Sequence, residues 1–136
     1  MSSLTARPAT PPTSLWRFTA AVVLAVASVD AVAGIATATA GGTWRPNGAG
    51  ITGALLLAVA LAGHAAAVHA VRTGRTRPLR LCLTVLVAWH ASCTTAMIFA
   101  CTAYGHTLDP GPIVFSALLA AAACWTSRAA PAAMRR

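Results

Sequence analysis

Hydrophobic residues form four long runs along the chain, and short polar stretches separate them. A transmembrane helix needs about 20 mostly apolar residues, and each run is long enough. Glycine, proline and arginine are concentrated in the breaks between the runs, as is typical of loops. The pattern therefore predicts an all-α integral membrane protein, with four transmembrane helices in a bundle. The predicted spans are residues 15–40, 51–71, 79–103 and 110–130.

The two ends of the chain differ in composition from the runs. Residues 1–14 are rich in proline, serine and threonine, and residues 131–136 end in two arginines. We therefore expect one transmembrane domain, 15–130, between a disordered cytoplasmic tail and a short basic cytoplasmic tail. The fourth run begins with a helix-start signature, because Asp109 can cap the helix and Pro110 stands where a missing amide costs nothing.

Arginines are distributed unevenly over the two ends of the predicted bundle. Nine of the ten arginines lie on one side, and only Arg45 lies on the other. The positive-inside rule places the first side, with both termini, in the cytoplasm, so we expect a multi-pass protein of the cytoplasmic membrane. Anionic lipid headgroups are the expected contact of the basic loop, which contains Arg72, Arg75, Arg77 and Arg80. Aromatic residues near both predicted interfaces agree with this placement: Trp16, Trp44, Tyr104 and Trp125.

A cleaved signal peptide is the alternative interpretation of the first run. Arg7 and Arg17 precede an apolar stretch, and Ala36-Thr-Ala38 has the small residues of a cleavage site. The apolar run continues past Asp30 for the length of a full span, which favours a retained helix. Cleavage would leave three spans and would remove Asp30.

Composition narrows the possible functions. Charged residues make up only 9% of the chain, and the net charge is +8. The arginines flank apolar runs and form no stripe interleaved with aromatic residues, so we expect no direct nucleic-acid binding. Motifs for acyl transfer, phosphate binding or zinc proteolysis are missing from the sequence, so we expect no catalytic residues and no enzyme. The expected partners are the lipid bilayer and either a second copy or another membrane protein.

Three ionisable residues lie deep within the runs. Such residues are costly in a membrane, so each is a candidate functional group. A rise of about 1.5 Å per residue places Asp30 ~20 Å, His64 ~12 Å and His90 ~15 Å from the arginine that borders its run. The two histidines reach similar depths, so they could ligate a haem, or either could share a proton with Asp30. The alternative is that Asp30 hydrogen-bonds a nearby backbone group or threonine and specifies the bundle.

A stripe of soft ligands follows the third span. At about 100° per residue, His90, Cys93, Met97 and Cys101 fall within about 80° of one another around the helix. Imidazole, thiolate and thioether groups suit Cu(I), so the stripe is a candidate metal path. Helix packing is the favoured explanation, because cysteine is common where membrane helices meet and methionine fills irregular gaps. We therefore expect no cofactor, with copper or haem as the alternatives.

Two further patterns concern packing. Cys93 and Cys101 are ~12 Å apart on one helix, too far for a disulfide, and we expect all four cysteines to be free. Small residues spaced four apart predict close helix contacts, at Gly34-xxx-Ala38-xxx-Gly42, Ala58-xxx-Ala62, Gly63-xxx-Ala67 and Ala117-xxx-Ala121.

The leading functional hypothesis is a non-catalytic accessory or interaction component of a membrane process. The alternative is a small transporter for a soft metal ion, or a proton-coupled one, that uses Asp30, His64, His90 and the Cys/Met stripe. Small multidrug exporters resemble the chain in having four spans with one acid in the first, although theirs is a glutamate and here the segment is Ser28-Val-Asp30-Ala31. In size and composition the chain is also similar to the spread proteins of actinomycete conjugative plasmids and to holins, which would imply a role in plasmid transfer or lysis.

Overall fold

The structure is a computed structural model, and it describes residues 13–42, 44, 48–105, 107 and 109–133. Most of the predicted tail at 1–14 and residues 134–136 lie outside this set, whereas Thr13, Ser14 and 131–133 belong to helices. No strand occurs in the described part of the chain. Its four helices are α1 (Thr13–Ala40), α2 (Ala49–Thr73), α3 (Arg77–Tyr104) and α4 (Pro110–Ala133).

Each helix covers one predicted span, and the ends differ from the predicted bounds by three residues at most. Every helix is long and apolar enough to cross a membrane. Large apolar side chains cover the outside of the bundle, among them Val29 at 70% and Leu118 at 66% exposed. Lipid accommodates such side chains, whereas water does not. The chain is therefore an all-helical, multi-pass membrane protein.

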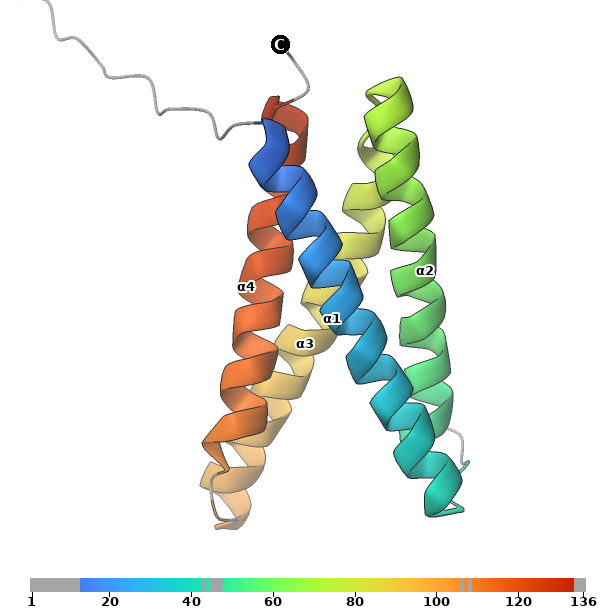
Figure 1. Ribbon diagram of the computed structural model, residues 1–136. Helices are drawn as coiled ribbons and strands as arrows, with labels where there is room; N and C mark the ends of the chain where they lie inside the picture. The colour runs from blue at the N-terminus through green and yellow to red at the C-terminus, as the bar shows by residue number, and fades with distance from the viewer. Residues whose placement is uncertain (1–12, 43, 45–47, 106, 108, 134–136) are drawn as a thin grey trace, which may run out of the picture.

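The helices form two hairpins that cross each other (Figure 1). Helix α1 packs mainly on α2, and α3 mainly on α4, with smaller contacts between α2 and α3 and between α1 and α4. At one end of the bundle α1 begins beside the end of α4, and α2 ends beside the start of α3. At the other end the two hairpins diverge. The two helices of each hairpin are therefore closest at the end where the hairpins diverge. They are farther apart at the end where the hairpins are in contact.

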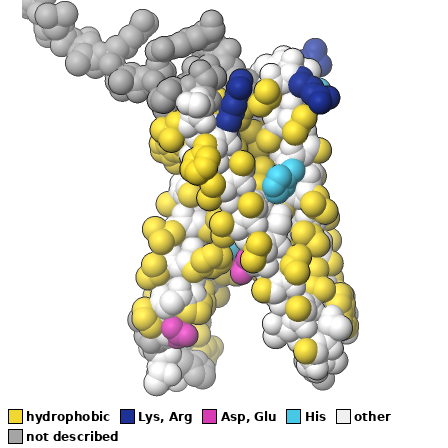
Figure 2. Space-filling view, in the orientation of Figure 1, with side chains coloured by type: hydrophobic (Ala, Val, Ile, Leu, Met, Phe, Trp, Pro, Cys, Tyr) yellow, Lys and Arg dark blue, Asp and Glu magenta, His cyan; other side chains and the backbone are white. Residues whose placement is uncertain are grey.

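All described arginines lie at the end where the hairpins touch, and we call this the arginine end. Figure 2 shows the basic side chains of the visible face gathered there, above a largely apolar surface. Arg45, the one arginine predicted on the other side, lies outside the described residues. The residues at the arginine end are Arg17, Arg72, Arg75, Arg77, Arg80 and Arg128.

The link between the hairpins is short. Gly74 ends α2 in the left-handed conformation, with φ 72°, and its N–H donates to the carbonyl of Ala70 at 2.9 Å. A side chain is strained at this φ, so glycine suits the position. After Arg75 and Thr76, α3 begins at Arg77 with Pro78 in its first turn. Three residues therefore tether one hairpin to the other.

Close approach within the first hairpin depends on glycines of α2. A Cβ on Gly53 would lie 2.8 Å from the carbonyl oxygen of Ala31, and one on Gly63 would lie 2.5 Å from Leu24 Cδ2. Of the predicted small-residue pairs, Gly63 is therefore in a contact. The alanines of two other pairs are exposed: Ala58, Ala62, Ala117 and Ala121.

Local hydrogen bonds satisfy most polar groups within the helices. The hydroxyl of Thr126, which is fully buried, donates to the Ala122 carbonyl at 2.8 Å. The hydroxyl of Thr94 likewise donates to the backbone carbonyl of His90, one turn earlier, at 2.9 Å. Bonds of this kind let serine and threonine lie at membrane depth without another partner. The predicted cap of α4 is confirmed, because the N–H of Gly111 donates to Asp109 Oδ1 at 3.0 Å.

The four aromatic residues of the predicted interfacial belt divide into two groups. Trp44, Tyr104 and Trp125 are exposed near helix ends, as an interfacial belt requires. Trp16 lies at the arginine end but is fully buried in the bundle. Its surface is covered because the start of α1 lies against α4.

Candidate functional site

His90 lies on the inner face of α3, where the two hairpins cross. The side chain is only 3% exposed and follows the buried leucines Leu83 and Leu86 on the same face. Its ring meets Phe115 of α4 edge to face, with 6.3 Å between centroids and an angle of 83°. Within the described residues its Nδ1 has no hydrogen-bond partner. A buried imidazole nitrogen without a partner is costly, so this position calls for a functional explanation.

Asp30 approaches His90 from the other hairpin. It is partly exposed and lines a groove of about 270 Å³, with Gly53 and Leu56 of α2 and Trp89 of α3. Its carboxylate is close enough to act electrostatically on both His90 and Cys93. The crossing of α1 and α3 thus places near each other, without a hydrogen bond between them, the two ionisable residues for which proton sharing was predicted. The alternative for Asp30, a hydrogen bond with a threonine or backbone group, is not found among the described residues.

The soft-ligand stripe of α3 does face the interior. His90 is buried, and Cys93, Met97 and Cys101 are partly buried along the same side of the helix. Met97 and Cys101 line a separate cavity of about 190 Å³ near the start of α4, away from His90. Among the described residues, no three His, Cys, Asp or Glu side chains come together as a metal site would require. The four side chains share the inner side of α3, and copper binding stays an alternative to helix packing.

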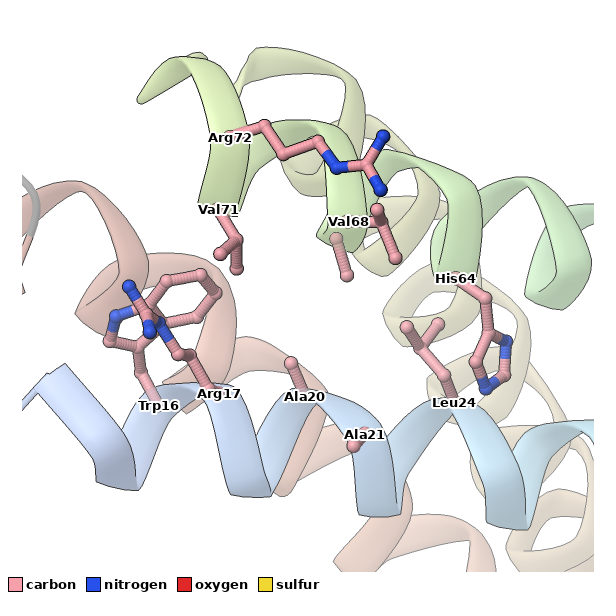
Figure 3. Close-up of a pocket in the computed structure, with 10 residues that line it drawn as sticks. Trp16, Arg17, Ala20, Ala21, Leu24, His64, Val68, Val71 and Arg72 are labelled. Carbon is pink, nitrogen blue, oxygen red and sulfur yellow. The ribbon is translucent and has the colours of Figure 1, made fainter.

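His64 has different surroundings from His90. Its Nδ1 donates to the carbonyl of Ala60, one turn earlier on α2, at 2.8 Å. Its ring lines a cavity of about 300 Å³ between α1 and α2, beside Leu24 (Figure 3). His90, by contrast, packs on Phe115 of α4. The structure therefore does not pair the two histidines as ligands of one group, and the alternative of haem ligation by them gains no structural support.

The arginines of the basic loop are all exposed at the arginine end. Arg72 lines the cavity between α1 and α2, opposite Arg17. Arg77 and Arg80 border a shallow groove on α3 with Leu81 and Thr84. Exposure at one end fits contact with lipid headgroups, which stays a prediction. All four cysteines, Cys82, Cys93, Cys101 and Cys124, are free, as expected.

Three residues of the site did not emerge from the sequence. Trp89 is 37% exposed and lines the Asp30 groove, Phe115 packs on His90, and Gly53 lies in the groove wall. The sequence did contain a signal for Trp89, which is its depth: it adjoins His90 within a span and lies far from either predicted interface. Function has to be inferred from these residues, because comparisons of the chain with protein-family models, with curated proteins and with solved structures find no match.

Proposed function

We propose that the chain is a small transporter of the cytoplasmic membrane, with both termini in the cytoplasm, that couples movement of a cation to a proton held by Asp30 and His90. The observation that carries the proposal is that Asp30 of α1 lies close enough to His90 of α3 for its charge to act on the imidazole, at the crossing of the hairpins. Ionisable side chains inside a membrane bundle are rare and mark ion or proton pathways.

The two residues have complementary positions. Asp30 is accessible from a groove, whereas His90 is buried behind it. A proton that reaches the carboxylate can pass to the imidazole, which gains and loses a proton near neutral pH in ordinary surroundings. The charge of Asp30 also acts on the thiol of Cys93. With the arginine end in the cytoplasm, the groove extends toward the exterior end, because its lining runs from Asp30 to Thr37 on α1 and includes Thr52 near the start of α2.

The groove favours a cation as the transported species. A carboxylate and an indole ring line it together, from Asp30 and Trp89. Carboxylates attract cations by charge, and indole faces attract them through their quadrupole. The remaining lining residues are mostly small or apolar, so a lipophilic organic cation fits better than a strongly hydrated metal ion. Binding of the cation at Asp30 would displace the proton.

The test uses tetraphenylphosphonium as the probe and purified protein in detergent. Binding in weakly buffered solution is expected to release protons, and a pH indicator measures them. The Asp30→Asn variant should neither bind tetraphenylphosphonium nor release protons. The matched control is Asp109→Asn, which removes the only other acid while keeping a residue that can cap α4. Unchanged proton release in Asp30→Asn would refute the proposal.

A second candidate function is an accessory subunit of a larger membrane assembly. One observation favours it: a groove of about 550 Å³ lies between α2 and α3, lined by Leu55, Val59, Val85, Ala88, Trp89 and Ser92 among others. Its apolar walls and small residues would accept a helix of another membrane protein. Under this hypothesis Asp30→Asn leaves the cellular phenotype intact, whereas Ala88→Leu, which narrows the groove, abolishes it. The opposite pattern supports transport.

A further inference from the structure

The cavity between α1 and α2 at the arginine end has apolar walls and a basic mouth. Ala20, Ala21 and Leu24 form one wall, and Val68 and Val71 form the other. The cavity exists because α1 leaves α2 here and turns toward α4 (Figure 1). Its volume of about 300 Å³ opens at the surface of the bundle. Small side chains on α1 keep it open over ~10 Å, from Arg17 to Leu24.

Two arginines flank the mouth, one from each helix. Figure 3 shows the Arg72 side chain reaching over Val68 and the Arg17 side chain beside Trp16, on the other side of the cavity. The Arg17 guanidinium lies 5.9 Å from the centre of the Trp16 ring. Guanidinium groups present several donors in a plane and bind phosphate oxygens with two hydrogen bonds. The mouth is therefore suited to a phosphate group.

The charge at this end has no acidic counterpart among the described residues. Asp30 lies midway along α1, and Asp109 lies at the start of α4, at the opposite end. A headgroup that also carried an ammonium group would find no carboxylate to pair with. A headgroup with net negative charge is consequently favoured over a zwitterionic one.

Trp16 completes the apolar wall at the outer end of the cavity. The residue lines the cavity and is fully buried, and Figure 3 shows its six-membered ring turned toward the cavity and its indole nitrogen turned away. The ring therefore extends the apolar surface along which an acyl chain would lie.

We propose that this cavity is a binding site for one anionic phospholipid, whose phosphate lies between Arg17 and Arg72 and whose acyl chain runs along Ala20, Ala21 and Leu24. His64 closes the inner end of the cavity. Its Nδ1 is already bonded to Ala60, so the ring acts there as a wall. The proposal is independent of the transport function, because Asp30 and His90 do not line this cavity.

The test measures lipid retention by the full chain. Protein purified in detergent is depleted of lipid, titrated with mixed micelles of phosphatidylglycerol or phosphatidylcholine, and analysed by native mass spectrometry. We expect one phosphatidylglycerol to be retained, and phosphatidylcholine to bind more weakly. Arg72→Gln should weaken phosphatidylglycerol binding about fivefold, the equivalent of ~1 kcal/mol for one arginine at the surface.

Two control variants distinguish a specific lipid site from non-specific electrostatic attraction to the arginine end. Arg75→Gln removes the same charge three residues farther along the chain and outside the cavity, so it should leave binding unchanged. Val68→Trp fills the cavity and keeps both arginines, so it should prevent binding; Ala21→Leu serves if that variant fails to fold. An equal loss in Arg75→Gln, full binding in the filled variant, or displacement of the lipid by inorganic phosphate would each overturn the proposal.

Discussion

The carbonyl oxygen of Ala31 lies 2.8 Å from the place where a Cβ on Gly53 would stand, so α1 and α2 approach as closely as their backbones allow. The contact is next to Asp30 in the sequence, and Gly53 lines the Asp30 groove. Packing of the first hairpin and the shape of the candidate site therefore depend on the same point. Disturbance of the contact should affect both.

Gly53→Ala tests this contact. The added methyl group meets a backbone oxygen, which cannot move without shifting the helix, so the free energy of unfolding should fall by ~1–3 kcal/mol. Unfolding in mixed micelles with increasing dodecyl sulfate, followed by circular dichroism, measures the change. Gly111→Ala is the matched control, because its Cβ would meet Asp109 Oδ1 at an ordinary 3.4 Å. Equal stability of Gly53→Ala and the wild type would show that the helices are not in backbone contact.

Gly63→Ala is expected to cost less than Gly53→Ala. Its nearest neighbour is Leu24 Cδ2 at 2.5 Å, the end of a flexible side chain. Leu24 can turn into the cavity between α1 and α2, so repacking should limit the loss to ~1 kcal/mol. The same titration ranks the two variants. A larger loss for Gly63→Ala would mean that Leu24 has no room to move.

His90→Leu should raise stability. The change removes the buried, unpartnered Nδ1, which costs ~1–3 kcal/mol, and gives up an edge-to-face contact worth ~0.5–1.5 kcal/mol. We expect a net gain of ~1 kcal/mol, together with loss of proton-coupled transport. Leu86→Ala, one turn earlier on the same face, should instead lose ~2–5 kcal/mol. Destabilisation by His90→Leu would show that Nδ1 has a partner in the membrane.

The orientation can be tested with single cysteines. In a variant whose four native cysteines are replaced by alanine, Thr107→Cys lies at the end opposite the arginines and Thr73→Cys lies at the arginine end. With the arginine end in the cytoplasm, an impermeant maleimide added to intact cells labels only Thr107→Cys. Labelling of Thr73→Cys in intact cells would reverse the proposed topology.

Helix positions and residue depths could be predicted from the sequence, because long apolar runs set the helices and the rise per residue sets depth. That reasoning placed Asp30 and His90 deep in the bundle, where they lie near each other at the crossing. Rotation about each helix axis could not be predicted. In α2 nearly every face carries alanine or another small or apolar residue, so Ala58 and Ala62 were as plausible an interface as Gly53.

The same uncertainty in helix rotation explains why the predicted pairing of His64 with His90 is not seen. Its depth matched that of His90, but the rotation of α2 turns its ring toward Leu24 of α1. The cavity between α1 and α2 could not be predicted either, since it depends on the angle at which α1 crosses toward α4. Crossing angles follow from side chains that interlock in three dimensions, which a linear pattern of apolar residues does not specify.

The three-residue link from Gly74 to Thr76 is placed to act as a hinge between the two hairpins. It ties the hairpins together at the arginine end, and no other described segment joins them. A rotation of one hairpin against the other leaves that end almost still and swings the free ends apart. The helix ends remote from the arginines would then move farthest, and Asp30, midway along α1, would move by an intermediate amount.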